Sequence, residues 1–287
     1  MNKIGFIGVG VMGKSMVRNL LKAGFAVQIY ARSREKVEDV IADGAAFCET
    51  IADCVKGCEA VITMVGFPKD VEEVYFTPGT VFDSAEAGAY LIDMTTTSPS
   101  LSEKLYACGT ERGFHMVDAP VTGGDVGARN GTLSILVGGD KADFDACVPL
   151  FQAMGTNINY QGGAGCGQHA KMANQIMVAC NLAGLCEALS YGKAKGLDLQ
   201  VLMNSLATGA AGSRQLDVYA PRILSGNYDP GCFLKHFVKD LGLAADEAEK
   251  SALSLDVLQQ TLRIAQEVEA AGYGDRGNHI VMKHYEK

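Results

Sequence analysis

The sequence is poor in positive charge, and this shortage limits the partners that the protein can bind. It has 25 lysines and arginines against 33 aspartates and glutamates, which gives a formal net charge of −8. Nucleic acids and anionic membranes usually require a basic surface, so we expect no nucleic-acid partner and no membrane partner. A local basic pocket for an anionic small molecule remains compatible with this balance.

Several kinds of segment are also missing from the sequence. No stretch is long, polar and low in complexity, so we expect little disorder. No stretch reads as a membrane span, and the chain enters a strand pattern at Lys3, so we expect no secretion signal. The nine cysteines are scattered, without paired CxxC motifs. We therefore predict reduced thiols, no metal site and a cytoplasmic location.

The first 30 residues have the order that is typical of a dinucleotide-binding site: strand, glycine-rich turn, helix, strand. The turn is Gly8-Val9-Gly10-Val11-Met12-Gly13. Gly8 permits the tight turn, Gly10 lets the backbone approach a pyrophosphate, and Gly13 lets helix and strand pack closely. A glycine turn without a ligand is the alternative, which this context disfavours. The predicted cofactor contacts here are Gly8, Gly10, Val11, Met12 and Gly13.

The end of the second strand favours NADP over NAD. An NAD site usually has Asp or Glu at this point, where it binds the ribose hydroxyls. This chain has Ala31-Arg32-Ser33-Arg34 instead. Because a guanidinium binds phosphate through charge-assisted hydrogen bonds, we predict that Arg32 and Ser33 bind the 2′-phosphate of NADP, helped by Arg34. The alternative is that these residues are solvated charges opening a helix over 34–43.

Strands alternate with helices as far as residue 162, which predicts a mostly parallel sheet. Ligands bind outside the carboxyl ends of such strands. The loops after the strands at 60–65 and 89–94 are therefore expected to contact the cofactor through Val65, Gly66, Thr95 and Thr96. Ordinary turns or helix caps at these residues are the alternative. The loop Val121–Asp125 exposes consecutive amides beside the hydroxyl of Thr122, which makes a nest for a carboxylate or else a plain glycine turn.

The segment from Gly165 to Lys195 has no proline and is apolar on nearly every side. We predict a long helix, buried either between domains or in a subunit interface, that links a first domain, 1–162, to an all-helical second domain, 163–287. A homodimer or homotetramer is expected if one chain cannot cover this helix. Asp198, Ser213 and Ser254 are predicted N-caps of later helices, and the tail from Gly272 onward is predicted to be polar and to pack at the surface or against a partner.

Lys171 is an unusual residue near the start of this helix. Helix N-termini disfavour cations, and a buried ammonium is costly unless it is paired or functional. We therefore predict that Lys171 is the catalytic acid and base, and a lysine that reaches solvent is the alternative. Asn174 lies one turn further along the same helical face. His169 is a lesser candidate, and Lys239-Asp240 is either functional or a surface ion pair.

Four motifs in this order resemble the β-hydroxyacid dehydrogenases, the family of 3-hydroxyisobutyrate dehydrogenase and the glyoxylate/succinic semialdehyde reductases. They are Gly5–Gly13, Asp118–Gly124, Gly165–Asn174 and Lys239–Leu241, and they cover essentially the whole chain. The resemblance implies a Rossmann domain followed by a helical domain like that of 6-phosphogluconate dehydrogenase. It also implies an oxidoreductase that moves a hydride between NADP(H) and a small carboxylate-bearing substrate, with glyoxylate or succinic semialdehyde favoured.

The resemblance further implies roles for individual residues. Lys171 is the catalytic lysine, Lys239 lies against the nicotinamide, and the substrate is bound by Thr122, Gly123, Gly124, Asn174, Phe233 and Asp240. Where the family usually has serine and a second asparagine, this chain has Thr122 and Gln175. The alternatives are an NAD-dependent dehydrogenase of 3-hydroxyisobutyrate, 3-hydroxypropionate, serine or tartronate semialdehyde, and a catalytically silent NADP-binding sensor.

Overall fold

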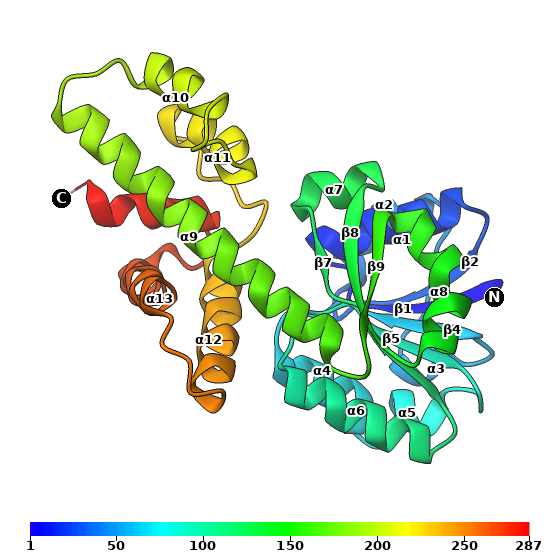
Figure 1. Ribbon diagram of the computed structural model, residues 1–287. Helices are drawn as coiled ribbons and strands as arrows, with labels where there is room; N and C mark the ends of the chain where they lie inside the picture. The colour runs from blue at the N-terminus through cyan, green and yellow to red at the C-terminus, as the bar shows by residue number, and fades with distance from the viewer. Residues whose placement is uncertain (287) are drawn as a thin grey trace. The chain divides into compact units, whose positions relative to one another are not determined.

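The computed structural model describes residues 1–286, and the chain divides into two compact units (Figure 1). The first unit is Met1–Lys171 and the second is Met172–Lys287. Strands and helices alternate in the first unit, whereas the second is helical. This α/β-then-α order confirms the predicted fold class, while the domain limits of 1–162 and 163–287 stay a prediction.

The first unit is built on a mostly parallel sheet. The strand order is β3-β2-β1-β4-β5-β6-β8-β7, and β9 pairs with β8. From β3 to β6 all neighbours are parallel, whereas β8 is antiparallel to β6 and β7. The strands are β1 Lys3–Ile7, β2 Ala26–Tyr30, β3 Ala46–Phe47, β4 Ala60–Thr63, β5 Tyr90–Asp93, β6 His115–Asp118, β7 Val121–Thr122, β8 Leu133–Gly139 and β9 Gly155–Gly162.

Helices cover both faces of this sheet (Figure 1). The central strands are therefore buried on both sides, and in β4 Ile62 joins one apolar cluster while Val61 joins the other. This explains why the strands read as continuous apolar runs. One face carries α1 Val11–Lys22, α2 Glu38–Ala42, α7 Gly124–Asn130 and α8 Lys141–Met154; the other carries α3 Ile51–Val55, α4 Pro68–Phe76, α5 Val81–Ser84 and α6 Pro99–Glu111.

The second unit packs its helices around one apolar cluster. Helix α9, Cys166–Ala194, starts in the first unit and contributes Leu182 and Leu189 to this cluster. The predicted caps at Asp198 and Ser213 are confirmed, because their side chains accept hydrogen bonds from backbone amides in the first turns of the helices that follow. These helices are α10 Leu199–Ala207, α11 Arg214–Leu224, α12 Leu234–Lys250 and α13 Asp256–Val268.

Two sequence predictions about the end of the chain are wrong. Ser254 does not cap α13, because Leu255 occupies the cap position and the Ser254 hydroxyl bonds to the Asp256 carboxylate at 2.8 Å. The tail is not a polar surface segment either. After η2, Glu269–Tyr273, it forms η3, Asn278–Tyr285, and buries its apolar side chains in the second unit's core.

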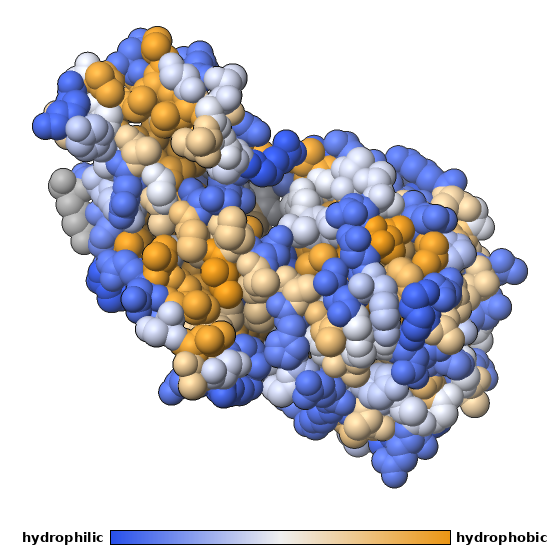
Figure 2. Space-filling view, in the orientation of Figure 1, coloured by the Kyte–Doolittle hydropathy of each residue, from blue (hydrophilic) through white to orange (hydrophobic). Residues whose placement is uncertain are grey.

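Helix α9 corrects one expectation and leaves another open. By length and composition alone it is apolar enough to cross a membrane, so the expectation that no segment reads as a span is wrong. Core helices of globular proteins pass the same test, and α9 carries charged residues. Within one chain, Met177 is 60% exposed and Tyr191 is 65% exposed on α9, so burial of this helix between domains or in a subunit interface stays a prediction. Figure 2 shows further hydrophobic surface over α10.

Candidate functional site

The glycine-rich turn lies where the strand order changes direction. Strand β1 pairs with β2 on one side and with β4 on the other, which is the position where open α/β sheets bind ligands. Gly8 has a φ of +100°, and a Cβ on it would lie 2.2 Å from the carbonyl oxygen of Met64. Only glycine fits there, so the turn rests directly on the end of β4.

The N-terminus of α1 is open above this turn. Gly10 occupies the cap position without a side-chain hydrogen bond, and a Cβ on Gly10 would meet nothing within 4 Å. The next residue, Val11, is 49% exposed. Free amides and a positive helix end at an open surface fit the pyrophosphate of a dinucleotide. Met12 and Gly13 continue the same first turn of α1.

The two arginines after β2 have different surroundings. The Arg32 side chain is 87% exposed and lies 4.0 Å from a carboxylate oxygen of Asp70. Arg34 instead packs over the ring of Phe47 and lies 3.5 Å from Glu49. Arg32 can therefore turn towards a phosphate more readily than Arg34 can. Ser33 stands at the cap position of the short helix η1, Arg34–Val37, with which the predicted helix over 34–43 begins.

Thr95 joins the two predicted cofactor loops after β4 and β5. Its hydroxyl accepts a hydrogen bond from the amide of Val65 at 3.0 Å, and Gly66 and Thr96 follow in these loops. Thr95 is only 1% exposed, so its role in the structure is to brace the neighbouring loop. The Thr95 amide in turn donates to Asp93 at 3.1 Å.

Asp93 is a buried carboxylate that the sequence reasoning missed. Its Oδ1 accepts hydrogen bonds from Thr95 and from the hydroxyl of Thr63, the latter at 2.7 Å. Burial raises the pKa of Asp93 to about 6. The available signal was an acidic residue that ends an otherwise apolar strand, Tyr90–Asp93.

The predicted carboxylate nest has a backbone that requires glycine. Gly123 has a φ of +129° and Gly124 a φ of +64°, and both values lie in a region that other residues rarely adopt. Thr122 precedes them as the last residue of β7 and pairs with Ser134 of β8. Consecutive backbone amides beside a hydroxyl in this conformation fit a small anion.

Lys171 is buried, and its Nζ donates a hydrogen bond to the carbonyl oxygen of Val121 at 2.8 Å. Val121 immediately precedes Thr122, so the structure brings the predicted catalytic lysine to the start of the predicted carboxylate loop. His169, two residues earlier on α9, is exposed and is not part of this arrangement.

Two further buried side chains hold the start of α9. Asp118, at the end of β6, accepts hydrogen bonds from the amides of Gly165 and Gln168, both at 2.9 Å. Burial raises the pKa of Asp118. The Gln168 side chain bonds to the loop after β5, through the carbonyl of Thr95 at 2.7 Å and the amide of Thr97 at 3.1 Å. The motifs contain both residues, but their spacing gives no sign of these contacts.

In the second unit, most of the predicted residues form a chain of polar contacts. Asn174 donates to Gln175 at 2.7 Å, and Gln175 donates to Asp240 at 2.6 Å. Lys239 lies 2.9 Å from the same carboxylate. The fourth predicted residue, Phe233, precedes α12 and has its ring 5.7 Å from that of His236, outside this chain of contacts.

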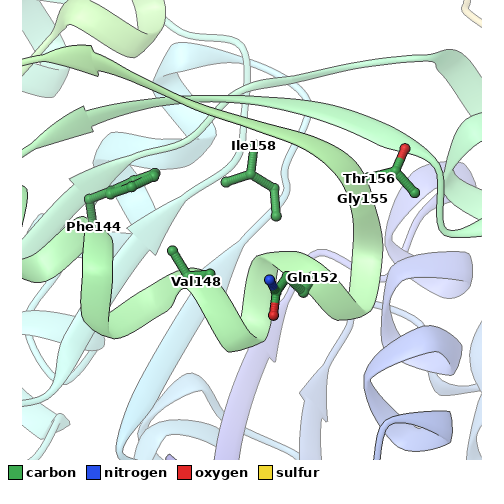
Figure 3. Close-up of a pocket in the computed structure, with 6 residues that line it drawn as sticks. All are labelled: Phe144, Val148, Gln152, Gly155, Thr156 and Ile158. Atoms are coloured by element: carbon green, nitrogen blue, oxygen red, sulfur yellow. The ribbon is translucent and has the colours of Figure 1, made fainter.

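A pocket of about 410 Å³ lies elsewhere in the first unit (Figure 3). It contains none of the predicted site residues. Nor do residues 1–286 contain a group of three or more His, Cys, Asp or Glu side chains that could hold a metal ion. The pocket is lined by Phe144, Val148 and Gln152 of α8 and by Gly155, Thr156 and Ile158 at β9.

Comparison with known proteins covers both units. Residues 3–163 match the family described as the NAD binding domain of 6-phosphogluconate dehydrogenase. Residues 165–285 match the family described as the NAD-binding domain of NADP-dependent 3-hydroxyisobutyrate dehydrogenase. The two matches together span nearly the whole chain.

Individual relatives are similar over their full length. An uncharacterized oxidoreductase of Bacillus subtilis is 47% identical over 98% of this chain and 97% of its own. An NAD-dependent L-serine dehydrogenase of Pseudomonas aeruginosa is 35% identical over 99% of this chain and 97% of its own. The crystal structure of a 3-hydroxyisobutyrate dehydrogenase from Salmonella typhimurium superimposes with a TM-score of 0.92 at 25% identity, covering 99% of this chain and 100% of that one.

Proposed function

Because the chain belongs to the β-hydroxyacid dehydrogenase family, we propose that it transfers a hydride between NADP(H) and a small carboxylate-bearing semialdehyde or 2-oxo acid. Family membership makes it an oxidoreductase with a nicotinamide cofactor. The choice of NADP and of substrate is the proposal, and glyoxylate and succinic semialdehyde are the favoured substrates.

The observation that carries the proposal is the contact between Lys171 and the residue before the carboxylate loop. The Nζ of Lys171 is 2.8 Å from the Val121 carbonyl oxygen. The amides of Gly123 and Gly124 and the hydroxyl of Thr122 hold the substrate carboxylate. A small substrate bound there has its carbonyl oxygen within reach of the lysine ammonium.

The chemistry divides between the cofactor and these side chains. When bound, the nicotinamide cofactor supplies or accepts the hydride. Lys171 donates a proton to the carbonyl oxygen during reduction and takes it back from the hydroxyl during oxidation, as a general acid and base. The loop at Thr122–Gly124 keeps the substrate in one orientation while this proton moves.

Residues of the second unit have roles that rest on the family resemblance. Asn174 binds the substrate, and Phe233 shapes its pocket. Asp240 orders the polar chain, and Lys239 contacts the nicotinamide. The buried hydrogen bond between Gln175 and Asp240, at 2.6 Å, supports an ordering role for Asp240. The exposed apolar side chains of Met177 and Tyr191 support the proposal that this unit assembles into a homodimer or homotetramer.

The preference for NADP rests on Arg32. Its guanidinium is mostly exposed. Arg32 and Ser33 follow β2 at the place where an NAD site usually has a carboxylate for the ribose hydroxyls. The second candidate is an NAD-dependent dehydrogenase of 3-hydroxyisobutyrate or L-serine. These two substrates are in the names of the Salmonella and Pseudomonas proteins, and the name of the Pseudomonas protein also gives NAD.

A rate panel separates these candidates. NADPH and NADH oxidation is measured with glyoxylate, succinic semialdehyde, methylmalonate semialdehyde and tartronate semialdehyde, and NADP⁺ and NAD⁺ reduction with 3-hydroxyisobutyrate and L-serine. We expect NADPH to give the higher kcat/KM, and Arg32→Asp to lower it by at least tenfold while Arg34→Ala changes it less. Equal or better rates with NADH would refute the role of Arg32. Binding of NADPH without turnover of any substrate would instead support a silent sensor.

A further inference from the structure

We propose that Gln168 is a positioning residue for the reaction: its side-chain amide fixes the first turn of α9 to the loop after β5, and so holds the ammonium group of Lys171 in place. The inference rests on the proposed function in that it takes Lys171 as the acid and base. It assigns Gln168 no contact with substrate or cofactor.

The side-chain amide of Gln168 makes two hydrogen bonds, one as a donor and one as an acceptor. The Nε2 donates to the carbonyl oxygen of Thr95 at 2.7 Å, and the Oε1 accepts from the amide of Thr97 at 3.1 Å. The side chain is completely buried. Because a buried backbone group without a hydrogen-bond partner destabilises the folded state, each of these bonds resists displacement of the helix relative to the loop.

The backbone of the same residue is held by a neighbouring strand. The amide of Gln168 donates to Asp118 at 2.9 Å, and the other carboxylate oxygen accepts from Gly165. Strands β5 and β6 are adjacent and parallel, so the first turn of α9 is fixed to the ends of both. The side chain of Gln168 bonds directly to the loop after β5.

The position of Lys171 follows from this attachment. Lys171 lies three residues after Gln168, on the same face of the helix, so the two side chains move together when the turn rotates. The ammonium of Lys171 bonds to the carbonyl of Val121, which follows Asp118 by three residues. A displacement of about 1 Å at a reacting group costs up to roughly 100-fold in rate, so a loosened first turn should be visible in kcat.

The chemistry of the clamp calls for glutamine in particular. A glutamate carboxylate has the same shape but cannot donate to the Thr95 carbonyl oxygen while it is ionised. When protonated, it offers one donor and one acceptor and can restore both bonds. Methionine fills the same volume with neither. The series Gln168→Met and Gln168→Glu therefore separates loss of the clamp from loss of volume.

The test compares these variants with Gln28→Met. Gln28 is a partly buried residue of β2 whose amide donates to the carbonyl of Cys54 at 2.9 Å, so its loss removes a similar bond elsewhere in the same unit. With the best substrate of the rate panel, we expect Gln168→Met to lower kcat by about 10- to 100-fold and to change KM by less than about threefold. Gln28→Met should leave both near wild type.

The pH dependence of Gln168→Glu distinguishes positioning from a loss of folding. Its kcat relative to wild type should be low near pH 8 and should rise as the pH falls towards about 5, because the glutamate then becomes protonated. A ratio that is constant over this range, or a Gln168→Met enzyme with near-normal kcat, would overturn the proposal. If Gln168→Met does not fold, the Gln168→Glu profile decides the question.

Amide hydrogen exchange gives a readout that does not depend on the proposed function. Gln168→Met should speed exchange in residues 95–97 and 166–172, whereas Gln28→Met should not. If the wild-type enzyme turns over none of the substrates, the proposed function fails and exchange alone decides whether Gln168 fixes this segment. Unchanged exchange would refute the positioning role even in an active enzyme.

Discussion

The ammonium of Lys171 and the carbonyl oxygen of Val121 are 2.8 Å apart, although the two residues are separated by 50 positions in the chain. This contact joins the first turns of α9 to the loop that begins with Thr122. It gives the proposed acid and base a fixed place beside the proposed carboxylate site.

Replacing Lys171 with methionine should remove most of the catalytic activity while leaving cofactor binding intact. General acid–base catalysis contributes roughly 10²- to 10⁴-fold, so kcat should fall by about that factor. Steady-state kinetics measure the loss, and NADPH fluorescence titration measures the binding. Lys104→Met is the control, because Lys104 is an exposed lysine that contacts Glu72. Near-normal turnover of Lys171→Met would rule out the mechanism.

Adding a methyl group at Gly124 should weaken substrate binding. Gly124 has a φ of +64° and Gly79 a φ of +78°, and a Cβ on either would meet nothing within 4 Å. Both Gly124→Ala and Gly79→Ala should therefore cost about 1–2 kcal/mol of stability through backbone strain alone. Only Gly124→Ala should raise the substrate KM, because it disturbs the nest. If both variants raise KM equally, or neither does, Gly124 does not bind the carboxylate.

The parts of the fold that the sequence predicts are those with local signals. The spacing of three glycines marks the turn after β1. The change from alternating strands and helices to helices alone marks where the sheet ends. The predicted catalytic lysine stood out because a cation is unfavourable at an apolar helix start. In each case the information lies within about 30 consecutive residues.

The parts that the sequence does not predict depend on contacts between distant residues. Gln168 bonds to Thr95 over 73 positions, and no spacing rule connects a glutamine on a helix with a loop after a strand. The burial of the tail is not predicted for a related reason. Its apolar run, Ile280-Val281-Met282, is too short to show a helical period and is flanked by polar residues. Only the packing of the second unit shows that it is buried.

The buried carboxyl of Asp93 should make stability depend on pH. Its pKa is raised by burial from 3.8 to about 6. The folded state therefore holds this proton more tightly than the unfolded state does. This contribution to stability is therefore fully present below about pH 4 and is lost as the pH rises to about 6.

Asp93→Asn removes this titration and keeps an acceptor for Thr63 and Thr95. The variant should gain stability relative to wild type between about pH 4 and pH 6 and keep that gain above, up to about 3 kcal/mol for two pKa units. Urea unfolding at a series of pH values measures the difference. Asp145→Asn, at an exposed aspartate that pairs with Lys141, is the control and should show no such trend. A difference that does not vary with pH would contradict the raised pKa.

Shortening Ile280 should destabilise the second unit. Ile280 is 2% exposed and belongs to that unit's apolar core. Removing the buried side chain in Ile280→Ala loses its transfer free energy and leaves a cavity, which together cost about 2–4 kcal/mol. Chemical unfolding measures the loss. Lys283→Ala is the matched control three residues later, because the Lys283 side chain is 40% exposed, and it should cost less than about 0.5 kcal/mol. If both variants lowered the free energy of unfolding by the same small amount, Ile280 would not be buried in the core and the predicted surface position of the tail would be supported.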